Sequence, residues 1–562
     1  MLLLWLACNK PDIKLDPKES GYIDKHSEVI DDSGDSSESG SDSPADSDDS
    51  DTGQASSLVR LDVVPQGLTV AVGASWSMQV VGTDSDGRRD WTTASRWYSD
   101  DEAVATIDTN GLVVTTGPGS TWLHAERDGL EAGALLTVRE DGLVQIQAID
   151  GRDGTGLGKV TVTLPDGSTG TTDADGKLSL PWADPGPLTL TAYKPKFNGV
   201  AFVDTVSRSI VFTTFPKEQD LQDATLHGQV DLSAVPEGDW DQLVVGMGGA
   251  GAQGELAGLI LEDLLGEDRE LTVLGATVHA PGNLFIKGTV EDYQTQIWSE
   301  PVVAWGLAGA LDIASLTAAT GVGEVMRMLT QNLDDFRWGY AGGGVGTTGG
   351  TTELDLAMAT PFDQTMSLLL PALPSGFNGT EAYFLMSAQE RVDGWVVDGF
   401  GEGQAGEQAV LHRVAAGSVE AALGEAVLLY NEVGGLGTSG TVATAIAENY
   451  GGSWESPDLL AIPTLDSWDA AGRSIALTVD SRSNYVRLRA FDRHKLAYDI
   501  YLPGSYTGPL PAADPDFLWE DADLQVISAE STLLSREDSI STGLLDPRQQ
   551  QARRMVRAGW SF

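Results

Sequence analysis

Apolar and polar residues alternate along most of the chain from Leu58 onward, and this pattern predicts a mainly β protein. Apolar and polar residues alternate in the stretch "VRLDVVPQGLTVAVGASWSMQVVGTDSDG" (59–87), and turn residues separate its alternating runs. A period of two is typical of half-buried strands. "NYVRLRAFDRHKLAYDIYLPG" (484–504) predicts a hairpin with "DRHK" as its connection, and "ELTVLGATVHAPGNLFIKG" (270–288) predicts two strands broken at Pro281–Gly282.

Helical spacing is rare and occurs in two places. Apolar residues three and four positions apart predict a helix over 322–336. A second helix is predicted over 546–558, because Asp546 can cap it, Pro547 suits its first turn and Gly559 can end it. The expected fold is therefore mainly β and multidomain, with tandem β-sandwiches followed by a large β-rich region that has a few helices.

Residues 58–139 resemble the bacterial Ig-like domain, group 2. The matching residues are, in order, Pro65, Val72–Gly73, the "TDSDG" turn at 83–87, Trp97, Ser99–Asp100, "VATID" at 104–108, "NGLV" at 110–113, Gly117, Gly119 and the closing strand that ends at Val138. The resemblance implies a β-sandwich that serves cell-surface proteins as a spacer, an adhesive module or a sugar-contacting module. Beside the resemblance, Trp97 is the expected large side chain of the core.

Residues 142–215 resemble the carboxypeptidase regulatory-like domain, a small transthyretin-like sandwich. The matching residues are Val160, Val162, Leu164, Asp166–Gly167, "TTDADGKLSLP" at 171–181, Gly186, Leu188, Leu190 and Ala192. The resemblance implies a β-module that binds, braces or spaces and that contributes no peptidase residues.

The N-terminal segment "LLLWLAC" resembles the end of a bacterial lipoprotein signal peptide, with Ala7 before Cys8. The resemblance implies that Cys8 carries the lipid and that residues 1–8 are a truncated signal with its lipidation site. Trp5 stands where the family usually has Leu, and the basic and apolar regions of a signal are incomplete. The alternative is a frayed or buried N-terminus with an incidental thiol.

Residues 9–57 follow as an acidic Asp/Ser-rich linker. Its central run "DDSGDSSESGSDSPADSDDSDTG" (31–53) has no basic residue and almost no apolar one. Such a composition cannot bury enough apolar surface to fold, and like charges extend it. We expect a disordered spacer between a membrane and the folded domains; calcium binding by the acidic run is the alternative.

Length, net charge, cysteine content and the absence of long apolar runs limit which classes of function the sequence favours. The chain has 562 residues, which suggests about three to five domains. Acidic residues outnumber basic ones 83 to 34, for a net charge of −49, so nucleic acid is an unfavourable partner. Cys8 is the only cysteine, which excludes an internal disulfide. No apolar run approaches the roughly 20 residues of a transmembrane helix.

The remaining chain resembles no family that we can name. We divide it into a β-rich domain at 216–450, a smaller β-rich domain at 451–545, and a C-terminal basic helix and tail at 546–562. Arginines of that last segment could dock on the protein's own acidic surface or touch anionic lipid, and a solvated terminal helix is the alternative.

Motifs for catalysis or cofactors are weak throughout. Residues 401–406 and 344–349 both match a dinucleotide fingerprint, but neither has the required strand–helix context. The "GTSGT" at 437–441 lacks a nucleophile elbow's second glycine, and no two of the six histidines are spaced for zinc. "DWD" (239–241) and "WEDAD" (519–523) pair carboxylates with Trp, as in sugar-cleaving sites and on ordinary strand edges. We expect no catalytic, cofactor-binding or metal-binding residue.

Two kinds of binding residue remain open. Trp76, Trp91 and Trp122 could form an exposed face for sugar stacking, or they could pack in the core and at strand edges. The Asp–Gly turns at 84–87 and 173–176 could bind calcium, although each supplies only two carboxylates and Asp–Gly is itself a turn signal.

The sequence thus predicts a cell-envelope lipoprotein of a bacterium, more a non-enzyme than an enzyme. Its expected role is surface binding, adhesion or scaffolding, with the membrane as one partner through Cys8 and a protein or carbohydrate ligand at the surface. The expected location is the outer membrane or cell surface. The alternative is an anchored or secreted hydrolase acting on polysaccharide or peptide, with catalysis in 216–562. The sequence does not identify the ligand, the membrane leaflet or the oligomeric state.

Overall fold

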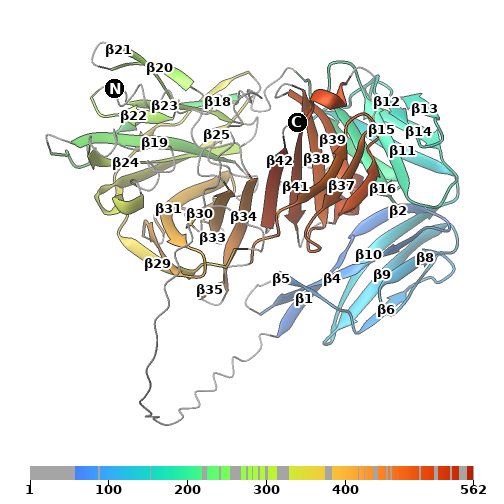
Figure 1. The fold of residues 1–562 in the computed structure, drawn as a ribbon. Helices are drawn as coiled ribbons and strands as arrows, with labels where there is room; N and C mark the ends of the chain where they lie inside the picture. The colour runs from blue at the N-terminus through green and yellow to red at the C-terminus, as the bar shows by residue number, and fades with distance from the viewer. Residues whose placement is uncertain are drawn as a thin grey trace, which may run out of the picture.

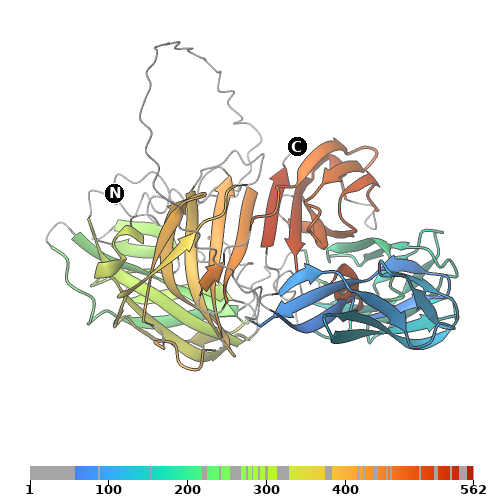
Figure 2. The same cartoon turned by 90° about the horizontal axis from the view of Figure 1, so that it is seen from below.

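The computed structural model is mainly β and multidomain, as the alternation predicts (Figure 1). It describes residues 57–560 except 86–88, 152–153, 218–223, 240–241, 253–267, 274–275, 282, 289–290, 298–300, 313–327, 329, 348, 374–381, 416, 423, 434–440, 451–452, 456–457, 493–494, 512–516, 532–534 and 543–553. In two views the strands of residues 224–455 gather at one end of the molecule and the N-terminal sandwiches at the other (Figures 1 and 2).

The first unit is a sandwich of three short sheets. The sheets are β1 (Leu58–Val64), β4 (Gln79–Asp84) and β5 (Arg89–Thr92); β2 (Gly67–Ala71), β10 (Leu130–Arg139), β9 (Gly119–Arg127) and β6 (Arg96–Ser99); and β3 (Ser75–Ser77), β8 (Leu112–Thr115) and β7 (Ala105–Ile107). Their inward residues, such as Val70, Val80 and Leu123, are buried in one core. Trp97 is half-buried and packs against that core, so it contributes to the core without being enclosed by it.

In the second sandwich, as in the first, alternating apolar residues of the strands form the core. Its strands are β11 (Leu143–Asp150), β12 (Thr161–Thr163), β13 (Thr169–Thr171), β14 (Lys177–Pro181), β15 (Leu188–Tyr193), β16 (Gly199–Thr205) and β17 (Ser209–Thr214). Val160, Val162, Leu188 and Leu190, which carry the resemblance to the carboxypeptidase regulatory-like domain, are all buried. However, residues far along the chain complete this core, among them Tyr485.

One sheet of fifteen strands runs through the described part of the chain and joins the second sandwich to the C-terminal strands. The junction is β16, which pairs in parallel with β39, Gly199 lying opposite Tyr498. The sheet continues through β39 (Lys495–Leu502), β38 (Tyr485–Asp492), β41 (Asp523–Glu530), β42 (Arg554–Trp560), β34 (Thr441–Tyr450), β33 (Gly424–Val433), β30 (Ala382–Arg391), β31 (Gly394–Gln404), β32 (Gln408–Arg413) and β29 (Gln364–Leu369), with β35 (Ser453–Glu455) paired to β34.

A buried ion pair lies at this junction. Asp499 on β39 accepts hydrogen bonds from Arg487 Nε at 2.7 Å and Nη2 at 2.8 Å. It also accepts one from Asn198 Nδ2 at 2.9 Å, just before β16. Strand pairing and core packing run continuously between residues 142–215 and residues 451–545. The division of these residues into two separate domains therefore stays a prediction.

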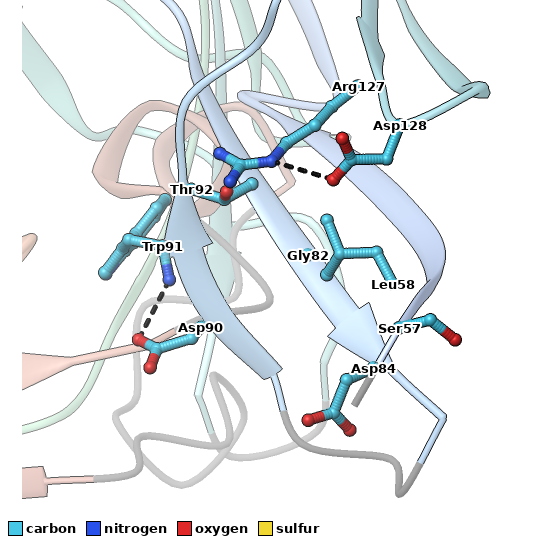
Figure 3. Close-up of a pocket in the computed structure, with 9 residues that line it drawn as sticks. All are labelled: Ser57, Leu58, Gly82, Asp84, Asp90, Trp91, Thr92, Arg127 and Asp128. Atoms are coloured by element: carbon cyan, nitrogen blue, oxygen red, sulfur yellow. Dashed lines mark hydrogen bonds and ion pairs between the residues drawn. The ribbon is translucent and has the colours of Figure 1, made fainter. Parts of the chain in front are cut away.

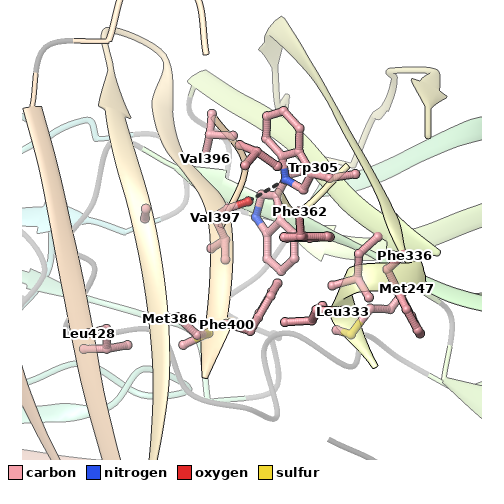
Figure 4. Close-up of a cluster of buried hydrophobic side chains, with 14 of the residues drawn as sticks. Met247, Trp305, Leu333, Phe336, Phe362, Met386, Val396, Val397, Phe400 and Leu428 are labelled. Carbon is pink, nitrogen blue, oxygen red and sulfur yellow. Dashed lines mark hydrogen bonds between the residues drawn. The ribbon is translucent and has the colours of Figure 1, made fainter. Parts of the chain in front are cut away.

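The body formed by residues 224–455 has a second layer of sheets. These are β23 (Asp292–Ile297), β18 (Ala224–Asp231), β26 (Thr351–Glu353) and β27 (Leu356–Ala357); β22 (Leu284–Ile286), β19 (Gln242–Ala252), β24 (Pro301–Asp312), β25 (Arg337–Val345) and β28 (Thr360–Pro361); and β20 (Asp268–Val273) with β21 (Ala276–Pro281). Large side chains fill the space between the layers (Figure 4). Within this core, Trp338 Nε1 donates a 2.8 Å hydrogen bond to the carbonyl of Val397.

The predicted hairpins are partly confirmed. β38 and β39 pair antiparallel, and Val486, Leu488 and Ala490 lie in one buried cluster as expected. The region 270–288 differs from the predicted pair of strands broken at Pro281–Gly282. Here β20 and β21, both before residue 282, pair antiparallel as a hairpin on either side of residues 274–275. A further small sheet contains β36 (Thr464–Asp469), β37 (Ser474–Thr478) and β40 (Tyr506–Pro509).

The predicted C-terminal helix is wrong over its described part. Residues 554–560 form β42, which lies between β41 and β34. Met555, Val556 and Ala558 are buried there, and Arg554 pairs with Glu530 on β41. Tertiary pairing therefore overrides the local helix signals, while Asp546 and Pro547 lie outside the described residues.

The predicted helix at 322–336 lies largely outside the described residues. Of its described residues, Met328, Thr330 and Gln331 are α-helical, as predicted. A 3-10 turn, η2 (Leu333–Asp335), follows directly before β25. Another 3-10 turn is η3 (Trp519–Asp521), and the helix α5 (Arg536–Thr542) lies between β41 and β42 in sequence.

Candidate functional site

The outer face of the sheet β2–β10–β9–β6 carries an exposed aromatic surface. Trp122 on β9 is 47% exposed and lies opposite Leu135 on β10, which is 41% exposed. Gly133 keeps room for the indole, since a Cβ at this position would lie 3.3 Å from Trp122 Cε3. We call Trp122, Leu135, Tyr98 and His124 the aromatic face.

Hydrogen bonds and ion pairs fix the aromatic face. The rings of Tyr98 and His124 stack with centroids 4.7 Å apart. His124 Nδ1 lies 2.9 Å from Glu131 Oε1, and its Nε2 lies 3.2 Å from Asp100 Oδ1. Tyr98 Oη donates to Glu131 at 2.6 Å, and this hydrogen bond raises the pKa of Tyr98 to about 12. The surface is therefore preorganised, with carboxylates beside flat rings.

A shallow pocket lies at the opposite edge of the first sandwich (Figure 3). Asp84, Asp90 and Asp128 line it with Arg127 and Trp91. Arg127 is turned to Asp128 at 3.4 Å and to the carbonyl of Thr93 at 2.8 Å. These contacts engage Arg127, the only cation among the residues that line this pocket.

A second cleft of about 500 Å³ lies between the first sandwich and the C-terminal strands. Trp76 on β3 and Trp91 on β5 line it from the sandwich. Ser481 and Arg482, from the loop between β37 and β38, line it from the other side. The two walls come from residues about 400 positions apart, so only the folded chain forms this cleft.

The helix α5 fixes the geometry of the cleft. Glu537 Oε2 accepts hydrogen bonds from Thr205 Oγ1 at 2.6 Å and from Ser207 N at 3.2 Å. Asp538 Oδ1 reaches the first sandwich and accepts from Gln66 N at 2.7 Å. Val206, between β16 and β17, packs into the core of the first sandwich. Three parts of the chain are thus held together beside the cleft.

The structure separates the three predicted tryptophans. Trp122 belongs to the aromatic face, whereas Trp76 and Trp91 lie on two other sheets and share the cleft. Trp76 also packs against the core and donates its indole N–H to Met78 Sδ at 3.2 Å. The alternative of one shared face does not hold, Trp76 packs on the core as the other alternative has it, and the two groups are distinct surfaces.

The two glycine motifs that match a dinucleotide fingerprint lie in strands and turns. Residues 401–406 run from β31 into the turn before β32, and 344–349 begin at the end of β25. Neither motif leads into a helix among the described residues. The turn at 173–176 uses Asp173 Oδ1 to accept from Asp175 N at 3.0 Å and Lys177 N at 2.8 Å. These bonds satisfy the carboxylate within the turn, as a turn interpretation requires.

The carboxylates of the body carry structural pairs. Asp398 on β31 is fully buried and accepts from Ser387 Oγ at 2.6 Å and Gln389 Nε2 at 2.5 Å. Arg413 Nη2 donates to it at 2.9 Å and also binds Glu425 through Nη1. Such a closed network braces strands and does not face a substrate.

Other predicted site residues are not brought together. His227 and His412 each contact one aspartate, at 3.3 Å and 3.1 Å. In the "WEDAD" segment Trp519 is buried in a core cluster. Cys8, the acidic linker, "GTSGT" and part of the "DWD" and 84–87 motifs lie outside the described residues. Within the described ranges, no three His, Cys, Asp or Glu side chains gather as a metal site. Nor does any helix there have the length and apolarity to span a bilayer.

The comparison with family models confirms the first sandwich. Residues 60–122 match the bacterial Ig-like domain (group 2). The exposed aromatic face and one wall of the cleft therefore belong to an Ig-like domain.

Similarity to curated proteins and solved structures is limited. The chain is 27% identical to ice-binding protein 1 of Shewanella frigidimarina over 189 residues, which are 32% of this chain and 20% of that protein. It thus spans about a fifth of that relative's length. Among solved structures, domains 5–6 of the S-layer protein SbsC match 43% of this chain and 98% of theirs at 14% identity and a TM-score of 0.14. The Bacillus anthracis TIE protein matches 72% of each chain at 7% identity and a TM-score of 0.13. At such scores the two structural likenesses carry no argument.

Proposed function

We propose that this chain is a non-enzymatic binding protein of a bacterial cell envelope, held to a membrane by lipid on Cys8. The acidic residues 9–57 would act as the spacer, and the Ig-like domain would present the binding surface. We also assign residues 142–215 to the carboxypeptidase regulatory-like family, here used as a brace between the Ig-like domain and the body.

The aromatic face carries this proposal. Trp122 and Leu135 expose apolar area side by side on a strongly acidic protein. Exposed apolar surface with a polar rim is typical of interaction sites. Because α5 and Val206 hold the Ig-like domain to the second sandwich, the face is presented in a fixed direction relative to it, as a scaffold or adhesin requires.

The rival hypothesis of a hydrolase needs a pocket in 216–562 with two carboxylates about 5–10 Å apart. The first pocket is lined by the first sandwich alone. The cleft is lined in part by residues 481–537, and Glu537 is the one carboxylate among its lining residues. The buried Asp398 is hydrogen-bonded to its neighbours. The observations therefore favour binding over catalysis.

Fractionation of cells that produce the full chain tests the anchor. We expect palmitate incorporation into the wild type and release of Cys8→Ala from the membrane fraction. Membrane association of Cys8→Ala equal to that of the wild type would contradict the anchor.

Cell adhesion tests the binding role. Cells producing the wild type are compared with cells producing Trp122→Ala for retention on a layer of isolated cell envelopes of the same strain. We expect a loss of about tenfold or more, as for a central aromatic contact residue. Val59→Ala, another exposed apolar residue but on β1, is the control and should retain the cells. Equal retention by Trp122→Ala would contradict the role of the aromatic face.

A further inference from the structure

The cleft between the Ig-like domain and the C-terminal strands has the dimensions of a small-ligand site. Its volume of about 500 Å³ falls within the range of roughly 300–1,000 Å³ that is typical of such sites. It also lies where two parts of the fold meet, a common location for ligand pockets.

Its wall on the Ig-like side is aromatic. Trp76 and Trp91 are both half-buried, so each places part of an indole ring at the surface of the cleft. The hydrogen bond from Trp76 Nε1 to Met78 Sδ and the packing of Trp76 on the core restrict that ring. The two half-buried indoles, one of them held in place, offer flat apolar area to a ligand.

Neutral polar groups lie beside the indoles. Ser77, Gln79 and Ser481 line the cleft, and their side chains make no hydrogen bond within the described part of the chain. They supply two hydroxyls and one amide, which can both donate and accept.

The charged groups that line the cleft already have partners. Arg482 Nη2 binds Asp480 Oδ2 at 2.6 Å and the carbonyl of Leu459 at 2.7 Å. Glu537 binds Thr205 and Ser207, as described above. Arg536 also lines the cleft, and its Nη1 lies 3.3 Å from Glu537 Oε1. Each charged side chain among the lining residues therefore has a partner, and the net charge of −49 disfavours an anionic ligand.

We propose that this cleft binds a neutral saccharide of one or two rings. A sugar ring has an apolar C–H face, which can stack on Trp76 and Trp91, and a hydroxyl rim, which matches Ser77, Gln79 and Ser481. The inference rests on the proposed binding role and adds a second site with its ligand class. The joints through Glu537 and Asp538 hold the walls in place before binding, which lowers the cost of ordering them.

Titration of the full chain with maltose, cellobiose, lactose and N,N′-diacetylchitobiose tests the inference, with tryptophan fluorescence and calorimetry as readouts. We expect saturable binding of at least one of them with a Kd below about 1 mM. Trp91→Ala should weaken that binding by about tenfold or more, because it removes one stacking surface. Ser481→Trp should abolish binding by filling the cleft while leaving both indoles in place.

Trp122→Ala is the matched control, because it removes an indole from the aromatic face and leaves the cleft intact. Circular dichroism confirms that each variant folds. The inference is overturned if none of the four disaccharides binds with a Kd below about 1 mM, or if binding survives both Trp91→Ala and Ser481→Trp. Failure of the aromatic face would instead appear in the adhesion of Trp122→Ala cells, so the two proposals fail separately.

Discussion

The carboxylate of Asp538 accepts a 2.7 Å hydrogen bond from the backbone N–H of Gln66, a residue 472 positions earlier in the chain. Its other oxygen accepts from the backbone N–H and the hydroxyl of Ser535, at 3.0 Å and 2.9 Å. Burial raises the pKa of Asp538, and the hydrogen bonds oppose that shift. One side chain thus links the start of α5 to the Ig-like domain.

Asp538→Ala is expected to loosen the Ig-like domain. The change leaves the N–H of Gln66 without its acceptor, at a cost of about 1–3 kcal/mol of unfolding free energy. Amide hydrogen exchange should rise at Gln66 and Gly67 before it rises in the cores. Ser541→Ala is the control, because Ser541 contacts only the carbonyl of Asp538 within α5. Unchanged exchange at Gln66 would show that the packing of Val206 alone holds the domain.

Asp499→Ala is expected to cost about 3–5 kcal/mol, since it leaves the guanidinium of Arg487 buried and unpaired. Chemical denaturation followed by circular dichroism measures the loss. Lys495→Ala, an exposed change on the same strand, should alter stability by less than about 0.5 kcal/mol. If both variants are equally stable, the ion pair between β38 and β39 does not stabilise this junction.

The loop that lines the cleft should be sensitive to acid. The hydrogen-bonded guanidinium of Arg482 lowers the pKa of Asp480 well below its usual value near 4. Because the folded value lies below the unfolded one, the stability from this pair is present above about pH 4 and is lost as pH falls through the folded value. We expect urea unfolding to show a steeper loss below about pH 4 in the wild type than in Asp480→Asn.

Arg482→Gln provides the control for this pH effect. It removes the cation but keeps the carboxylate, which still accepts hydrogen bonds from the backbone N–H groups of Ala461 and residue 482. The acid-dependent loss should therefore shrink, but by less than in Asp480→Asn. Parallel pH curves for the wild type and both variants would exclude the proposed coupling.

Glu131→Gln is expected to lower the pKa of Tyr98 from about 12 toward the ordinary value near 10. The carboxylate of Glu131 accepts the phenol proton, so the ionised phenol would lose a partner and face a like charge. Ultraviolet titration measures the change, with Tyr98→Phe as the reference that isolates this residue. Glu126→Gln, whose carboxylate pairs with Arg96, should have a smaller effect. An unchanged titration in Glu131→Gln would contradict the hydrogen bond.

Local sequence patterns predict the Ig-like domain well, because its strands lie close together along the chain. β9 and β10 are consecutive strands that pair directly, and alternation assigns their inward residues. The same holds for β38 and β39. The prediction of a terminal helix is wrong because Asp546, Pro547 and Gly559 indicate only the local conformational preference of the backbone. The pairing of β42 with β34, more than 100 residues away, decides the structure there.

The cleft could not be predicted from the sequence. Trp76, Trp91 and Ser481 share no spacing or motif, and only the packing of α5 and the parallel pairing at β16 bring them together. The sole signal was the high number of tryptophans within 76–122 flanked by polar residues. That signal identified residues of interest but left open whether the three share one face, since sequence does not show which short sheet each strand joins.

The pairing of β16 with β39 also determines the order in which the protein can be built. Residues 142–215 are made early, yet Tyr485, Tyr501 and Met555 complete their core. During synthesis or export, the apolar face of this segment stays exposed until residues 485–555 have emerged. Such long-range contacts favour slow folding and dependence on chaperones. A nascent chain that stops short of β42 would leave the long sheet split in two, so completion of the last strand is the step that commits the molecule to its final form.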